Sequence, residues 1–110
     1  MKQNNFDAWA NNIISFSICE LKIFHDDITE KLNLYLEICF SSLEKSTTHK
    51  IMFFDIQNFS LRQFSSKNEF YGLSIIDHAT DGYTKDNRFE FFDYEHERIH
   101  FFCSCYKLIQ

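Results

Sequence analysis

Apolar and polar residues alternate along several stretches of this chain, and the alternation predicts β-strands. The most regular stretch runs from Leu32 to Phe40, where five apolar residues occupy every second position. This periodicity is typical of a strand with one buried face. Residues 14–24 alternate less strictly, and the polar connection 25–31 makes these two stretches an expected antiparallel pair.

Four more stretches have the composition of strands, namely 50–56 (KIMFFDI), 70–76 (FYGLSII), 88–94 (RFEFFDY) and 98–108 (RIHFFCSCYKL). The first is apolar on both faces around Phe53 and Phe54, which predicts a central strand. The last two are expected to pair as a tight hairpin. Residues 58–66 suit an extended segment that runs into a turn.

Helical signals are confined to residues 4–12, where Phe6 and Trp9 stand three apart behind an Asn cap. No longer helical stripe and no strand–helix–strand spacing occurs. The sequence therefore predicts a mainly β fold, α+β at most. We expect a single antiparallel sheet or small sandwich of about six strands with a short N-terminal helix. The length of 110 residues predicts one domain over 1–110.

The composition is that of a folded chain, because 45% of the residues are apolar and 18% are aromatic. The net charge is −5 and no basic cluster occurs, which disfavours binding to nucleic acid. The N-terminal residues lack a signal-peptide pattern, and Glu20 and Lys22 interrupt the first apolar run, so no membrane span is expected.

The cysteines predict a cytoplasmic protein with free thiols. Each of the four lies within an apolar, strand-like run, where a reduced thiol behaves as a small hydrophobe. They are Cys19, Cys39, Cys103 and Cys105. The alternative is a disulfide-bonded protein, which we disfavour because no export signal accompanies the cysteines.

Residues 96–100 read HERIH, which matches the H-E-x-x-H pattern of zinc peptidases. That chemistry needs a helix, because only a helical turn lets His96 and His100 hold one ion beside Glu97. The alternation from residue 99 onward predicts a strand instead, in which residues four apart are spread over about 13 Å. We therefore expect no metal and no cofactor; a structural metal site through His100, Cys103 or Cys105 is the alternative.

The net charge is concentrated in residues 77–97. This stretch holds seven acids and two bases, whereas acids and bases outside it are equal at nine each. If the last strands pair as a hairpin, their connections would bring several carboxylates to a common surface that attracts basic partners. The alternative is that acidic loops keep a Phe-rich protein soluble.

Three segments follow one another in the second half, namely KIMFFDIQNFSL, YGLSIIDHATDG and RFEFFDYEHERIHFFCSCYKLI. A Phe-rich strand with an internal Asp precedes a final strand centred on aromatic-aromatic-Cys, and Trp9 stands before the first strand. Over about 60 residues this order resembles small bacterial immunity proteins with antiparallel sheets, which are encoded beside polymorphic toxins. The resemblance implies a non-enzymatic inhibitor that binds one toxin, often through acidic residues.

Our leading hypothesis is a non-enzymatic protein-binding module that neutralises a basic toxin through an acidic surface. The expected partner-binding residues are Asp77, Asp81, Tyr83, Asp86, Asp93, Tyr94 and Glu95. The alternative is a homodimer with a structural or scaffolding role, because the two-sided apolar strand over 51–56 could bury a face or an edge against a second copy. A small metal-dependent hydrolase using HERIH is the third hypothesis.

Overall fold

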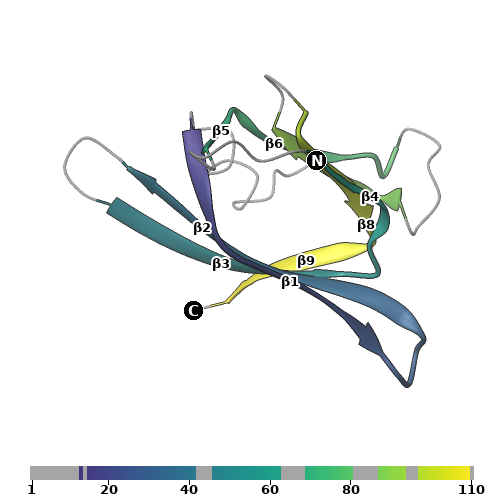
Figure 1. Cartoon of the computed structure of the whole chain (residues 1–110). Coiled ribbons are helices and arrows are strands. Elements are labelled where there is room, and N and C mark those ends of the chain that lie inside the picture. Colours follow the sequence, from purple (N-terminus) through teal and green to yellow (C-terminus); the bar gives the residue numbers. More distant parts are fainter. Residues whose placement is uncertain are drawn as a thin grey trace.

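The computed structural model describes residues 13, 15–41, 46–62, 69–80, 87–93 and 97–109. These residues form nine strands, all paired antiparallel, in two sheets (Figure 1). The strands are β1 (Ser15–Asp26), β2 (Lys31–Ser41), β3 (Ser46–Phe54), β4 (Gln57–Leu61), β5 (Glu69–Tyr71), β6 (Leu73–Asp77), β7 (Phe89–Asp93), β8 (Ile99–Cys103) and β9 (Cys105–Ile109). The five-stranded sheet has the order β5-β1-β2-β3-β9, and the four-stranded sheet has the order β4-β8-β7-β6.

The predicted mainly β, antiparallel fold is confirmed, and the sheets number two rather than one. The described part has more strands than expected because two predicted strands are each divided between the sheets, and because the segment predicted as extended contributes β4. The stretch 70–76 is divided at Gly72, and 98–108 is divided at Ser104. The predicted helix over 4–12 lies outside the described residues. No helix among the described residues has the length and apolar character that a membrane crossing requires.

The two sheets are joined by a bent ribbon, which consists of β3–β4 lying beside β8–β9. Phe54 pairs with Cys105 in the five-stranded sheet, and Gln57 pairs with Phe102 in the four-stranded sheet. At the bend, the backbone N and Oγ of Ser104 donate to the carbonyl oxygen of Phe54 at 3.1 and 3.3 Å. Both strands therefore pass from one sheet to the other at the same level, which is how a strand makes the corner of a packed sandwich.

Asp55 fixes this bend to β2. Its φ is 59°, a left-handed conformation that Asp tolerates better than most residues. Its backbone N donates to Asn33 Oδ1 at 2.9 Å, and Lys31 Nζ and Gln57 Nε2 each donate to its carboxylate at 3.3 Å. The buried Asp within the apolar stretch KIMFFDI therefore has hydrogen-bond partners, as a buried carboxylate requires.

Gly72 makes a second corner, between β5 and β6. β5 pairs with β1 in the five-stranded sheet, whereas β6 pairs with β7 in the other sheet. Gly72 is buried with a φ of 78°, a conformation that glycine adopts without steric cost. The single glycine in FYGLSII therefore turns the chain from one sheet into the other.

The core lies between the sheets and is formed by the alternating apolar residues of both. Leu34, Leu36 and Ile38 of β2 are all fully buried, as their spacing predicts. Phe53 of β3 meets two aromatic rings of the opposite sheet, Phe91 at 5.2 Å and Phe101 at 4.9 Å between ring centroids. Both contacts are edge-to-face, an arrangement that aromatic pairs prefer. Many of the phenylalanines therefore pack one sheet against the other.

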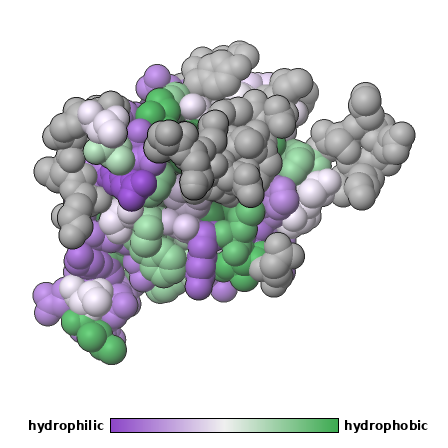
Figure 2. Space-filling model, turned by 180° about the vertical axis from the view of Figure 1, so that it is seen from behind, coloured by the Kyte–Doolittle hydropathy of each residue, from purple (hydrophilic) through white to green (hydrophobic). Residues whose placement is uncertain are grey.

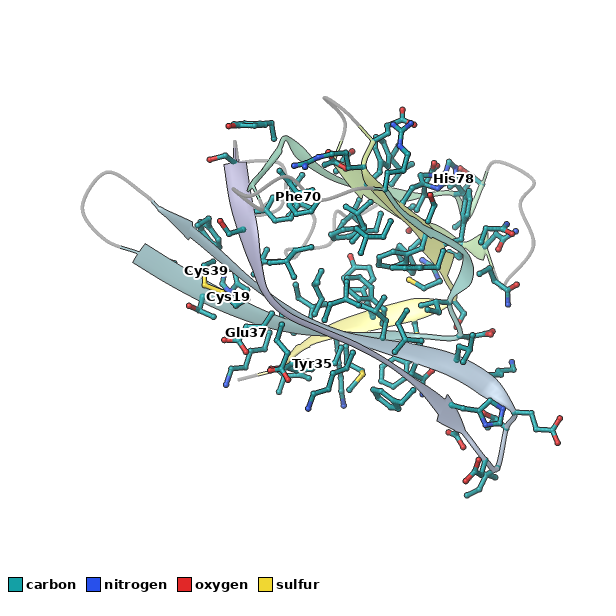
Figure 3. All side chains as sticks on the ribbon, viewed as in Figure 1. Cys19, Tyr35, Glu37, Cys39, Phe70 and His78 are labelled. Carbon is teal, nitrogen blue, oxygen red and sulfur yellow. A yellow bond between two sulfur atoms is a disulfide. The ribbon has the colours of Figure 1, made fainter. Side chains whose placement is uncertain are left out.

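Cys19 and Cys39 form a disulfide, so the prediction of four free thiols is wrong for this pair (Figure 3). Cys19 is exposed and follows the buried Ile18, so it lies on the side of the sheet that faces away from the core. Cys39 lies on that side too, because it alternates with the buried Ile38. Cys103 and Cys105 are free, and only Cys103 lies in the core.

Replacing Phe53 by Ala should lower the free energy of unfolding by about 3–5 kcal/mol, because it leaves a cavity between the sheets. Its neighbour Phe54 points to the opposite face and is only half-buried, so Phe54→Ala should cost about 1 kcal/mol. Urea unfolding followed by circular dichroism measures both. Equal losses for the two variants would contradict the assignment of faces.

Thiol titration in denaturant without reductant should find two reactive thiols per chain, Cys103 and Cys105, rather than four. The double variant Cys19→Ser/Cys39→Ser should lose about 2–4 kcal/mol of stability, because the disulfide constrains the unfolded chain. Cys105→Ser is the matched control at an exposed free thiol and should change stability by less than about 0.5 kcal/mol. Four reactive thiols would show that the disulfide does not form.

Candidate functional site

Asp77, one of the predicted partner-binding residues, is the last residue of β6 and is paired with Arg88. Arg88 Nε and Nη2 donate to the two carboxylate oxygens at 3.0 Å each, and the backbone N of Ala79 donates to Oδ1 at 2.9 Å. The hydrogen bonds from Arg88 are the main reason that the pKa of Asp77 lies below its ordinary value. A basic partner would therefore compete with Arg88 for this carboxylate.

Glu90 of β7 bridges two histidines on the outer face of the four-stranded sheet. Its Oε1 lies 2.7 Å from Nε2 of His78, and its Oε2 lies 2.7 Å from Nε2 of His100. Burial opposes ionisation of this carboxyl group, but the hydrogen bonds from His100 and His78 outweigh it and lower the pKa of Glu90. The ionised carboxylate therefore links three segments, since His78 follows β6 and His100 belongs to β8.

Aromatic rings surround this cluster, which we name the His–Glu–His cluster (His78, Glu90 and His100). The ring of Phe102 lies 5.2 Å from His100 and 6.3 Å from His78, and Phe92 lies 6.0 Å from His100. Both Phe side chains are half-buried, as are those of Glu90 and His100. The outer face of this sheet is therefore partly apolar, with one carboxylate that is hydrogen-bonded to two imidazoles.

The arrangement does not bring metal ligands to one point. The imidazoles bind different carboxylate oxygens, and no three His, Cys, Asp or Glu side chains among the described residues are placed to hold a metal ion. HERIH is not helical where it is described: Glu97 lies in a connection with a φ of 48°, and His100 lies in β8. His96 lies outside the described residues. The strand predicted from residue 99 onward is confirmed.

Asp93 lies inside the protein, so its carboxylate does not belong to an exposed acidic surface. Its side chain is fully buried, and its Oδ1 accepts a hydrogen bond from the backbone N of Ile99 at 2.9 Å. This bond holds the start of β8 next to the end of β7. The remaining predicted residues, Asp81, Tyr83, Asp86, Tyr94 and Glu95, lie outside the described residues.

The two acidic connections leave opposite ends of β7. The connection from β6 enters β7 at Phe89, whereas the connection to β8 leaves it at Asp93. Four steps along a strand span about 13 Å, so the connections start from separate places rather than from one. The expectation that both contribute to a common acidic surface stays a prediction, because Asp81, Asp86 and Glu95 lie outside the described residues.

A second exposed feature is the far end of the β1–β2 hairpin, residues 22–32, which we name the hairpin end. β1 and β2 have 12 and 11 residues, whereas each strand of the four-stranded sheet has five. The core-facing stripe therefore continues past the opposite sheet. Leu34 is fully buried, but Leu32 is 44% exposed and Ile23, the partner of Leu34, is 40% exposed.

The other face and the turn of the hairpin end are also apolar in part. Phe24 is 41% exposed, and Ile28 at the turn is 92% exposed. Figure 2 shows this projection at the lower left, hydrophilic along its sides and hydrophobic at its tip. The turn is well defined, because Asp26 Oδ1 accepts hydrogen bonds from the backbone N of Ile28 and of Thr29 at 2.9 and 3.3 Å. An ordered turn thus presents a large apolar side chain to solvent.

Sequence reasoning missed both the His–Glu–His cluster and the hairpin end. The sequence contains a weak signal for the cluster. If 88–94 and 98–108 form a hairpin, Glu90 and His100 lie on the same face as diagonal neighbours, because His100 is two residues from Phe102, the partner of Glu90. His78 has no such signal, because its position depends on the β6–β7 pairing. The exposed residues of the hairpin end follow the same alternation as the core residues, so the sequence pattern does not distinguish exposed from buried positions there.

Comparison with known protein families, with curated proteins and with solved structures finds no match to this chain.

Replacing Glu90 by Gln should lower the free energy of unfolding near neutral pH by about 1–3 kcal/mol, because two charge-assisted hydrogen bonds are weakened. A carboxyl group with a lowered folded-state pKa stabilises the fold above its ordinary pKa of 4.5, and this contribution is lost as the pH falls through the lowered value. The difference between wild type and variant should therefore shrink on acidification. Urea unfolding at a series of pH values measures it.

Glu97→Gln is the control for this series, because Glu97 is an exposed acid of the same stretch. It should leave stability nearly unchanged at each pH. A Glu90→Gln deficit that stays constant down to about pH 3 would contradict a role for the ionised carboxylate.

Proposed function

We propose that this chain is a non-enzymatic protein-binding module that neutralises a cognate basic protein, a toxin of the kind that immunity proteins inhibit. The observation that carries the proposal is the charge distribution: the whole net charge of −5 belongs to residues 77–97. An excess of one sign in one segment attracts partners of the opposite sign and accelerates their encounter. The resemblance of residues 50–109 to immunity proteins supports the same function.

The internal pairings narrow the set of acids that can meet a partner. Asp77 is bound by Arg88, Glu90 by two histidines, and Asp93 is buried. The acids that we propose for contact with a basic partner are those of the two connections. They are Asp81, Asp86, Glu95 and Glu97. Tyr83 and Tyr94 lie in the same connections and would supply aromatic contact area, which interfaces favour.

A cytoplasmic location accompanies this proposal and stays a prediction. Disulfides are rare in the reducing cytosol, so the pairing of Cys19 with Cys39 weighs against it. The thiol titration described above, applied to protein taken directly from cells, bears on this question.

A homo-oligomeric structural role is the second candidate function, and the apolar side chains of the hairpin end favour it.

The partner to test is the secreted protein encoded beside this gene, if it is basic. Co-expression of the wild-type chain should restore the growth of cells that produce this neighbouring protein. Asp81→Asn/Asp86→Asn or Glu95→Gln/Glu97→Gln should weaken binding on the order of tenfold at low salt and reduce its salt dependence. Isothermal titration at several salt concentrations measures affinity, and comparison of the two pairs identifies the connection that binds.

The control is Asp27→Asn/Glu30→Gln, which removes two acids at the exposed turn of the hairpin end. It makes the net charge less negative by the same amount as each of the other pairs and should leave affinity almost unchanged. If this control weakens binding as much as the other pairs, the effect is one of net charge and the proposed surface is wrong. Absence of growth protection by the wild-type chain would overturn the proposed function itself.

A further inference from the structure

β1 has an open edge over its second half. Its pairing with β5 covers only Ser15 to Ser17, and no described strand adjoins that edge from Glu20 to Asp26. The opposite edge of the same residues is fully paired with β2. An edge of this kind presents unpaired N–H and C=O groups and is a template for another strand. The segment therefore has the backbone geometry to extend the five-stranded sheet.

Each face of this edge carries one exposed apolar side chain, among charged residues on the outer face. Ile23 continues the core-facing stripe and Phe24 lies on the outer face, and both are about 40% exposed. Monomeric proteins usually blunt an open edge with charges; here these are Glu20, Lys22 and Asp26 on the outer face, and Lys22 Nζ lies 3.1 Å from Glu20 Oε2 of the same strand. A strand that pairs with this edge would cover apolar surface on both sides of the sheet and must accommodate Lys22.

We propose that two copies of this chain associate by antiparallel pairing of β1 with β1 of the second copy, centred on Phe24. This inference does not rest on the proposed toxin-binding function. It makes one continuous sheet from the five-stranded sheets of both copies, related by a two-fold axis perpendicular to the sheet. Such an axis keeps each residue on its own face, so opposite residues must have the same parity along the strand.

Side-chain charge disfavours the registers centred on Lys22 and Ile23, and the bulge disfavours the one centred on Leu21. A register centred on Lys22 opposes two lysines, and one centred on Ile23 opposes Glu20 to Asp26 of the second copy. A register centred on Leu21 would oppose Glu20 to Lys22, but it runs into the bulge at Cys19, where the faces no longer match. Like charges placed directly opposite each other destabilise a strand pair.

The register centred on Phe24 satisfies both charge and face. Lys22 lies opposite Asp26 of the second copy, and the symmetry makes this contact twice. Phe24 lies opposite its own copy on the outer face, and Ile23 lies opposite His25 on the core-facing side. Aromatic pairs and opposite charges are the cross-strand contacts that stabilise antiparallel sheets. The chain is thus complementary to itself along this edge.

Sedimentation equilibrium of the whole chain at micromolar concentrations should show a monomer–dimer equilibrium. Lys22→Glu should raise the dimer dissociation constant about tenfold or more, because both Lys–Asp contacts become contacts between like charges. Lys22→Glu/Asp26→Asn should recover most of the loss. Asn removes the charge at position 26 but keeps the side-chain oxygen that accepts from Ile28 and Thr29.

The matched control is Ile28→Lys, at the most exposed apolar side chain of the hairpin end but outside the paired segment. It should leave the dissociation constant unchanged. Lys22 is 66% exposed, so circular dichroism of Lys22→Glu should match the wild type. The proposal is overturned by a wild-type chain that stays monomeric, by larger oligomers in place of a dimer, or by Ile28→Lys weakening association as much as Lys22→Glu.

Discussion

The fold depends on the hydrogen-bonded bend at which β3–β4 and β8–β9 leave one sheet and enter the other. Ser104 donates twice to the carbonyl oxygen of Phe54, and Asp55 is held by Asn33 and Lys31. Phe53 and Phe101 lie on either side of this bend and meet in the core. A slip of one residue at the bend would turn one of these rings out to solvent, because side chains alternate along a strand. The register of the strands, the bend and the packing of the core therefore depend on one another.

Local alternation was enough to predict most strands but not the bends. The stretch from Leu32 to Phe40 carries its pattern within itself, and the structure follows it. Asp55 turns the chain because of Asn33, which lies 22 residues earlier, and Ser104 turns it because of Phe54, 50 residues earlier. A pattern read along the chain cannot contain such partners. The disulfide was disfavoured because no export signal accompanies the cysteines, whereas the pairing of β1 with β2 brings Cys19 beside Cys39, 20 residues later.

The acids of residues 77–97 show what counting charges leaves out. Asp77, Glu90 and Asp93 contribute equally to the net charge, yet their partners differ: a guanidinium, two imidazoles and a backbone amide. A carboxylate with an internal partner stabilises the fold and is less available to a second molecule. The sequence therefore predicts that the segment is acidic, whereas tertiary contacts determine which of its acids a partner can reach.

The strands of the two sheets differ in length, and this explains why the proposed dimer contact and the proposed contact with a basic partner use different strands. Strands of five residues can cover only part of a hairpin whose strands have 12 and 11, so the apolar stripe of β1 and β2 continues beyond the core. That overhang provides the edge around Phe24, in the five-stranded sheet. The acidic connections, by contrast, join strands of the four-stranded sheet. A dimer through β1 would thus engage one sheet of each copy and leave the other sheet's connections outside the paired segment. The dimer would then present two acidic segments. Once one segment is bound, the second lies at a high effective concentration, which raises the overall avidity for a partner with two sites without any new contact.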